Sequence, residues 1–301
     1  MADDHGPTVL SATLDQSATR AAFEMPDITG RFDEALTEYL TTIGARRAMV
    51  MFAFAPKAAG TFLRSAAIHA IDGQLMRVTH ALGGRDGTPY LPAFILYYAG
   101  HFPARTLVTH IHMQALPANC RMLEAFGIRP IIMLRDLGDM LASYLDMLNA
   151  GGGTEANGLN CVIPAGFESY ADDAKADFAI DILAPWYASY FASWLSYAAE
   201  FPDRVCVLRY REFLADPVKT LERSLRHSRV ECSEEQCRMA VETAWADRRR
   251  HRFNQGIRGR GRLYFTRHHI QRLEHLLFEH YRLASHRDDL LGASTPCDSA
   301  A

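Results

Sequence analysis

The chain lacks the features that mark membrane, secreted and nucleic-acid-binding proteins. No uncharged run reaches the roughly 18–20 residues that a membrane-spanning helix needs. The N-terminus shows neither the basic segment nor the apolar stretch of a signal peptide. A net charge of −3 supplies no overall basic field for nucleic acid or for an anionic membrane. We therefore expect a cytoplasmic protein with no nucleic-acid partner and no integral membrane segment.

Cysteine is also scarce, and its spacing excludes two further classes of site. The chain has 6 cysteines, none of them in a CxxC pair, and Cys206 lies in an apolar run. Disulfide frameworks and structural zinc sites both need closely spaced cysteines. The sequence therefore predicts free thiols in a reducing compartment and no metal site.

Length and composition are those of an ordinary globular protein. The chain has 301 residues, of which 49% are hydrophobic and 22% charged, enough to bury one sizeable core. Residues 1–30 are polar and predict an irregular arm, and residues 291–301 predict a frayed tail. We expect one domain over residues 31–290.

Short apolar runs alternate with helical patterns along this domain. Helices are predicted over residues 33–43 and 61–71. Strands are predicted over residues 47–55, 106–111, 130–135 and 204–210. Such alternation is typical of an α/β fold in which helices flank a central parallel sheet.

The segment 129–144 is the most informative part of the sequence. An apolar strand delivers Arg135, a turn follows, and Ser143 lies on the next helix eight residues later. Asp136 and Asp139 favour the positive end of that helix. A guanidinium at a strand end and a hydroxyl on the following helix can converge on one phosphate.

The segment 55–64 has the same order of strand, loop and helix. Its small residues allow backbone N–H groups to approach a phosphate, with Lys57 supplying charge and Thr61 a hydroxyl. It is not a Walker A loop, because Lys57 precedes Gly60 rather than following it at the helix start. ATP chemistry is therefore disfavoured, and two phosphate elements suggest a nucleotide with two separated phosphates.

Residues 151–169 form the longest segment of loop composition, rich in glycine and asparagine. Long loops in compact domains are often functional. Because this one follows the helix that carries Ser143, it is a candidate lid over a second substrate. A surface excursion without function is the alternative.

Together these segments resemble the cytosolic-type and bacterial sulfotransferases that use 3′-phosphoadenosine 5′-phosphosulfate (PAPS). The family's 5′-phosphosulfate loop reads roughly PKSGTTW, and the chain matches it in register at Pro56, Lys57, Thr61 and Phe62. Ala58 and Ala59 replace the Ser-Gly pair, and Gly60 stands where threonine is usual.

The resemblance extends to the family's 3′-phosphate element, which the chain matches with Arg135, Asp139, Ser143 and Tyr144. Between the two elements, Val108-Thr109-His110 stands in the place of a Lys-Thr-His strand and lacks the lysine.

Weaker matches to the family follow, up to about residue 266. They are the paired tryptophans Trp186 and Trp194, the Tyr210 segment, Thr243-Ala244-Trp245, and a terminal box with Gly256, Gly259, Phe265 and Thr266. Asn254-Gln255 replaces the Arg-Lys pair of that box, and Gly261 replaces its tryptophan. Arg258 is the nearest substitute for the missing cations.

The resemblance implies a P-loop-NTPase-like sulfotransferase fold and transfer of a sulfuryl group from PAPS to a hydroxyl of a small-molecule or glycolipid acceptor. It implies His110 and Lys57 as catalytic residues, with no metal. It implies a set of cofactor-binding residues: Lys57, Ala59, Gly60, Thr61, Phe62, Arg135, Ser143, Tyr210, Trp245, Gly256 and Arg258. Adenine is expected between Phe62 and Trp245.

Several alternatives stay open from the sequence. His112 lies two residues beyond His110 and is the rival base, and either histidine has a structural role or a metal-ligand role as its alternative. Tyr210 contacts the base or fills the core. A nucleotide kinase of similar architecture and a nucleotide-binding pseudoenzyme are the competing functions. The acceptor and the oligomeric state are not readable from the sequence.

Overall fold

The computed structural model describes residues 48–77, 89, 105–152, 163–247 and 258–292. The predicted arm over 1–30, the helix over 33–43, most of the 151–169 loop, Gly256 and nearly all of the predicted tail lie outside the described residues.

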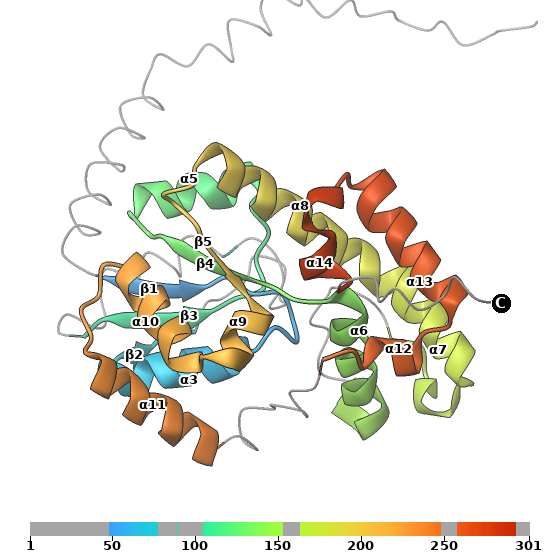
Figure 1. The fold of residues 1–301 in the computed structure, drawn as a ribbon, viewed down its shortest axis with the longest axis horizontal. Helices are drawn as coiled ribbons and strands as arrows, with labels where there is room; N and C mark the ends of the chain where they lie inside the picture. Colours follow the sequence, from blue (N-terminus) through green and yellow to red (C-terminus); the bar gives the residue numbers. More distant parts are fainter. Residues whose placement is uncertain (1–47, 78–88, 90–104, 153–162, 248–257, 293–301) are drawn as a thin grey trace, which may run out of the picture.

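A parallel sheet forms the centre of the described structure (Figure 1). Its five described strands lie in the order β2-β3-β1-β4-β5. Their bounds are Met49–Phe52 for β1, Gln74–Leu75 for β2, Leu107–His110 for β3, Pro130–Leu134 for β4 and Cys206–Arg209 for β5. The predicted α/β class with a central parallel sheet is confirmed, and the four predicted strands are all present with shorter bounds.

Described helices connect β1 to β2, β3 to β4 and β4 to β5, as parallel pairing requires. The helices around the sheet are α3 (Gly60–Ala70), α5 (Pro117–Ala125), α8 (Ala184–Glu200), α9 (Tyr210–Ala215), α10 (Pro217–His227) and α11 (Glu234–Ala246). In the view of Figure 1, α3 and α11 lie on one side of the strands and α5 on the other.

The remaining helices gather beyond the carboxyl ends of the strands, at the right of Figure 1. They are α6 (Leu137–Met147), α7 (Asp172–Phe178), α12 (Gly261–Tyr264), α13 (Arg267–Glu274) and α14 (Arg287–Leu290). No helix in the described part of the chain is long and apolar enough to cross a membrane.

The core follows from the sequence of the strands. All four residues of β1 and all five of β4 are buried, as expected for central strands covered by helices on both faces. Trp194, Tyr187 and Tyr190 of α8 are completely buried with them. Such full burial holds the strand ends in fixed positions relative to one another.

Candidate functional site

Predicted site residues from several described segments come together where three neighbouring strands end. β1 is the middle strand, and its last residue, Phe52, pairs with His110 of β3 on one side and with Ile131 of β4 on the other. After β1 the chain forms β2 and β3 on one side of β1, and then β4 and β5 on the other side. Ligands of open α/β sheets bind at such switch points, outside the carboxyl ends of the strands.

The loop 53–59 leads from β1 into α3 and presents backbone N–H groups at the helix start. Lys57 and Ala59 both have left-handed backbones, with φ of 64° and 63°. For residues other than glycine this costs about 1–2 kcal/mol each. Ala59 is the N-cap of α3 and has no side-chain acceptor for the first N–H groups of the helix. These donors suit an anion.

Two tyrosines of α8 hold this loop in place. The hydroxyl of Tyr190 donates a hydrogen bond to the carbonyl of Ala53, and that of Tyr187 donates to the carbonyl of Pro56 at 3.3 Å. Burial raises the pKa of Tyr190 well above its usual value, so its hydroxyl stays a donor. Neither tyrosine was predicted as a site residue, although the paired tryptophans pointed to the same helix.

Arg135 joins the two predicted phosphate elements. Its guanidinium donates to the carbonyl of Lys57 and lies 4.0 Å from the centre of the Tyr210 ring. The side chain is buried, and its Nε has no hydrogen-bond partner among the described residues. A buried donor of this kind normally finds a partner. Arg135 is therefore both a connection between the loops and a donor suited to an anion.

The side chain of Lys57 lies against α6, the helix that carries Ser143. The ammonium of Lys57 donates to the sulfur of Met147 at 3.1 Å and lies 5.9 Å from the centre of the Tyr144 ring. Ser143 is buried on the same helix. The structure thus brings Lys57 to the helix that carries the predicted 3′-phosphate hydroxyl.

The two histidines of the rival pair have different surroundings. His112 is buried, and its Nδ1 donates to the carbonyl of Phe54 at 2.7 Å. His110 lies against the start of α3, because a Cβ added to Gly60 would come within 2.1 Å of its Nε2. The backbone anchors His112, whereas His110 lies beside the loop. The sequence predicted Gly60 as a cofactor-binding residue of the loop but gave no sign of its contact with His110.

A row of aromatic rings runs from Arg135 to α11. Tyr210 packs on Phe213, Phe213 on Phe62, and Phe62 on Trp245, with ring centres 5.7, 5.5 and 4.9 Å apart. The expectation of adenine between Phe62 and Trp245 does not fit this arrangement. The two rings contact each other, and a base between them needs space for two ring-to-ring contacts. Phe213 was missed, although it lies one helical turn after Tyr210.

The carboxylate of Asp139 attaches the C-terminal segment to α6. It accepts hydrogen bonds from the backbone N–H groups of Gly259 at 2.9 Å and Gly261 at 2.8 Å. A Cβ on Gly261 would lie 2.5 Å from the carbonyl carbon of Gly138, so this position excludes the family's tryptophan. Arg258 is exposed at the start of the segment.

Asp136 caps α6 by accepting a hydrogen bond from the N–H of Asp139 at 2.8 Å. Burial, followed by the charge of Asp139, raises the pKa of Asp136 to about 6, although Arg135 and Arg262 act in the opposite direction. The carboxyl thus prefers its protonated form in the folded protein more than in the unfolded chain.

This shift predicts a pH dependence of stability. Between pH 4 and 6 the folded state holds a proton that the unfolded chain has lost, so the Asp136 contribution to the free energy of unfolding falls as pH rises. The full loss is at most about 3 kcal/mol. Asp136→Asn keeps a good N-cap and removes the titration. Urea unfolding between pH 4 and 7 should show the variant gaining stability over the natural protein as pH rises. A constant difference across this range contradicts the prediction.

Among the described residues, no group of three or more His, Cys, Asp and Glu side chains is placed to hold a metal ion. The HxH pair therefore has no third ligand within that part of the chain.

Comparisons with known proteins identify the fold but no matching sequence. No protein-family model and no curated protein matches the sequence. Among solved structures, mouse sulfotransferase SULT7A1 complexed with PAP aligns over 83% of this chain and 90% of its own, with 14% identity and a TM-score of 0.59. This chain has a sulfotransferase fold.

Two further solved structures of this type have lower TM-scores. Retinol dehydratase in a complex with retinol and PAP aligns over 81% of this chain and 85% of its own, with 13% identity and a TM-score of 0.48. A sulfotransferase from Alicyclobacillus acidocaldarius aligns over 79% and 99%, with 16% identity and a TM-score of 0.41. The fold assignment rests on the alignment with SULT7A1, which at 14% identity establishes the fold alone.

Proposed function

We propose that the protein is a PAPS-dependent sulfotransferase that transfers the sulfuryl group to a hydroxyl of a small-molecule or glycolipid acceptor. One observation carries the proposal. In a chain with a sulfotransferase fold, the two phosphate elements follow the adjacent strands β1 and β4, and Arg135 joins them through the carbonyl of Lys57. A nucleotide with separate 5′ and 3′ phosphate groups fits two such elements better than one with a single phosphate chain.

The proposed nucleotide contacts follow from this geometry. The N–H groups at the start of α3, with Ala59, Gly60 and Thr61, surround the 5′-phosphate, and the free Nε of Arg135 with Ser143 faces the 3′-phosphate. Trp245, Phe62 and Tyr210 provide aromatic surface for the base, with Trp245 the most accessible because it is only partly buried. Gly256 and Arg258 are proposed as further contacts to the 3′-phosphate.

Chemistry at this site consists mainly of positioning and charge stabilisation. When bound, PAPS supplies the sulfuryl group. Lys57 offers a positive charge near the leaving phosphate oxygen, and the α3 N–H groups add a fixed partial positive charge. His110 accepts the proton of the acceptor hydroxyl as that oxygen forms its bond to sulfur. The bond between sulfur and the 5′-phosphate oxygen breaks, and 3′,5′-bisphosphoadenosine leaves. Histidine suits this step because its ordinary pKa, about 6.5, leaves it mostly neutral at pH 7.

Nucleotide binding provides the first test. The protein should bind 3′,5′-bisphosphoadenosine at least tenfold more tightly than adenosine 5′-phosphate, because hydrogen bonds from Arg135 to a 3′-phosphate are charge-assisted, at roughly 1.5–3 kcal/mol each. Arg135→Ala should remove this preference without weakening the monophosphate comparably. Calorimetry measures both affinities.

Arg238→Ala is a suitable control, because Arg238 pairs with Glu235 and Glu242 on the surface of α11. It should leave both affinities unchanged. Equal affinity of the natural protein for the two nucleotides would reject the sulfotransferase assignment. Binding without turnover on any hydroxyl acceptor would leave a nucleotide-binding pseudoenzyme.

Lys57 gives a kinetic test. If the positive charge of Lys57 stabilises the negative charge that develops on the leaving oxygen, Lys57→Ala should lower kcat more than it raises KM for PAPS. A loss of roughly 2–4 kcal/mol in transition-state stabilisation, or about 30–1,000-fold in kcat, is typical for removing one such group. Lys219→Ala, which alters an exposed cation of α10, is the matched control. An unchanged kcat with a raised KM would show that Lys57 only anchors the phosphate.

A further inference from the structure

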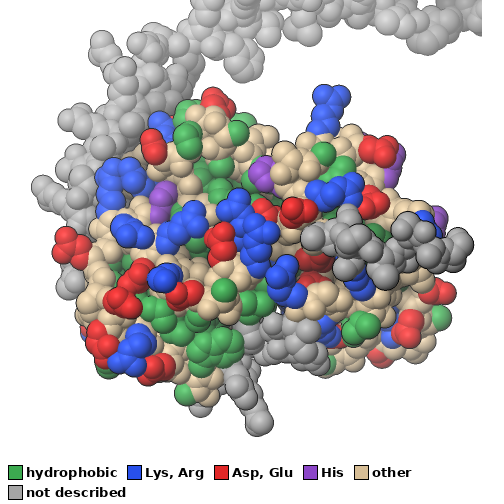
Figure 2. Space-filling view, in the orientation of Figure 1, with side chains coloured by type: hydrophobic (Ala, Val, Ile, Leu, Met, Phe, Trp, Pro, Cys, Tyr) green, Lys and Arg blue, Asp and Glu red, His purple; other side chains and the backbone are tan. Residues whose placement is uncertain are grey.

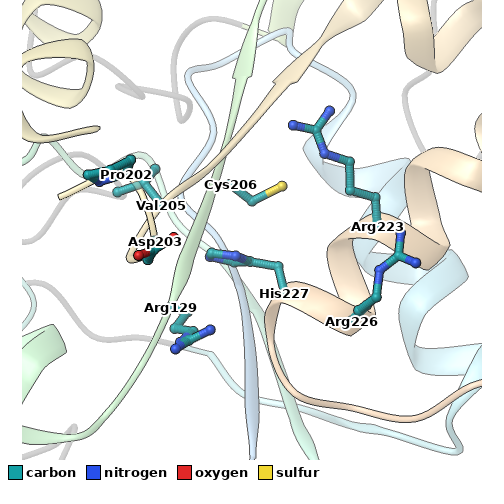
Figure 3. A pocket seen from close by; sticks show the side chains of 8 residues that line it. All are labelled: Arg129, Pro202, Asp203, Val205, Cys206, Arg223, Arg226 and His227. Carbon is teal, nitrogen blue, oxygen red and sulfur yellow. The ribbon is translucent and has the colours of Figure 1, made fainter. Parts of the chain in front are cut away.

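A pocket lies where β4 and β5 begin, at the opposite end of these strands from Arg135 and Tyr210 (Figure 3). Its volume is about 650 Å³, within the range of small-molecule sites. Arg129, directly before β4, and Cys206, the first residue of β5, form one side. Arg226 and His227 at the end of α10 form the other. Figure 3 shows the His227 ring extending from α10 toward the strand side of the pocket, with Arg129 nearby.

The pocket is strongly basic. Three arginines line it, against one lining carboxylate, that of Asp203. Arg223 already pairs with Glu212 at 3.5 Å and donates to the carbonyl of Val207 at 3.0 Å. No ion pair among the described residues includes Arg129 or Arg226. Figure 2 shows Lys and Arg side chains gathered on this face of the molecule, over the region of β5, α9 and α10.

The imidazole of His227 lies within the electrostatic influence of these arginines. Burial lowers the pKa of its imidazole most, and the charges of Arg129 and Arg223 lower it further, while backbone carbonyls of Arg204 and Pro130 act in the opposite direction. Its Nε2 is buried and has no hydrogen-bond partner among the described residues. Within the described part of the chain, Arg129 and Arg226 form no ion pair, and they lie beside an imidazole whose protonation is disfavoured. The resulting positive potential is one that an anion would neutralise.

We propose that this pocket binds a small organic phosphate or sulfate ester. Arg129 and Arg226 pair with its oxyanion, because a guanidinium offers several donors in the geometry of such groups. Pro202 and Val205, which also line the pocket, contact its organic part. The proposal does not depend on the proposed sulfotransferase activity.

This site is separate from the nucleotide site but connected to it by two strands. β4 begins next to Arg129 and ends next to Arg135, and its five residues span about 16 Å. β5 likewise begins at Cys206 and ends next to Tyr210. An ester bound in the basic pocket therefore does not occupy the space proposed for the nucleotide.

Calorimetry with phenyl phosphate tests the proposal, using the full chain with Arg135→Ala so that the candidate 3′-phosphate site is weakened. Arg129→Ala and Arg226→Ala, each added to that background, should lower the affinity roughly tenfold or more, as expected for loss of a charge-assisted hydrogen bond. Arg238→Ala should leave it unchanged. Inorganic phosphate should bind more weakly than phenyl phosphate, because it lacks the part that contacts Val205.

The imidazole of His227 provides an independent measurement. Its NMR signal is identified by its absence in His227→Asn, and its pKa should rise when phenyl phosphate saturates the pocket. Sodium chloride at equal ionic strength should not produce the same rise. Affinities unaffected by both arginine substitutions, or a His227 pKa that responds only to ionic strength, would overturn the proposal. Equal binding of inorganic phosphate and phenyl phosphate would overturn the ester as its ligand.

Discussion

Replacing His110 with alanine should remove nearly all sulfuryl transfer while nucleotide affinity stays close to normal. A positioned general base typically contributes roughly 10²–10⁴-fold to the rate. His110 lies beside the loop at the start of α3 and supplies no proposed phosphate contact, so its loss should affect kcat rather than binding. Turnover with PAPS and a panel of hydroxyl acceptors, together with calorimetry on 3′,5′-bisphosphoadenosine, measures the two effects separately.

His112→Ala is the matched control for this experiment. His112 is buried and donates to the carbonyl of Phe54, so its loss should cost about 1–3 kcal/mol of stability but little of the transfer rate. If His112→Ala is inactive and His110→Ala is active, the assignment of the base on this strand is wrong. If both variants are active, the base lies elsewhere, and a carboxylate from residues 151–169 becomes the next candidate.

Adding a single methyl group at Gly60 should disturb the same imidazole. A Cβ there would lie 2.1 Å from Nε2 and 2.5 Å from Cδ2 of His110, so the imidazole has to move. Overpacking typically costs about 1–3 kcal/mol. The better helix propensity of alanine offsets at most about 1 kcal/mol of this loss of stability. Gly60→Ala should therefore lower both the free energy of unfolding and the transfer rate, which urea unfolding and turnover assays measure.

The double variant Gly60→Ala with His110→Ala identifies the cause. Removing the imidazole creates space for the new methyl group, so the stability loss of Gly60→Ala should largely disappear in the double variant. Additive losses would mean that the clash with His110 is not what Gly60 avoids. Gly60→Ala with natural stability and activity would show that the ring has room to shift without consequence.

The sequence predicted the strands well because buried apolar runs bounded by polar residues leave few alternatives. It missed β2, whose two residues, Gln74 and Leu75, are too few to show a pattern. It placed Arg135 and Ser143 correctly at the end of β4 and on α6, because both lie within one strand–turn–helix unit. Local patterns therefore predicted the strand–turn–helix geometry of each candidate phosphate element by itself.

Contacts between distant segments were not predictable in the same way. Nothing around Gly60 indicates that the ring of His110 lies against it, and nothing around Trp245 shows that it packs on Phe62. The pocket of Arg129 and Arg226 also combines residues that no motif connects. Such contacts depend on the packing of helices against the sheet, which a single sequence does not encode in any short pattern.

The hydrogen bonds that the Asp139 carboxylate accepts from Gly259 and Gly261 affect when the site can form during protein synthesis. Gly259 and Gly261 lie 120 and 122 positions after Asp139 in the sequence. Helix α6 therefore leaves the ribosome long before these two backbone partners have been synthesised. Until then, a carboxylate that the finished protein buries lacks both bonds, beside the loop that holds Arg135. Nascent chains that end before residue 259 should therefore contain both candidate phosphate segments and still not form the complete candidate site. Competence to bind nucleotide would then appear late, after most of the sheet has already been made.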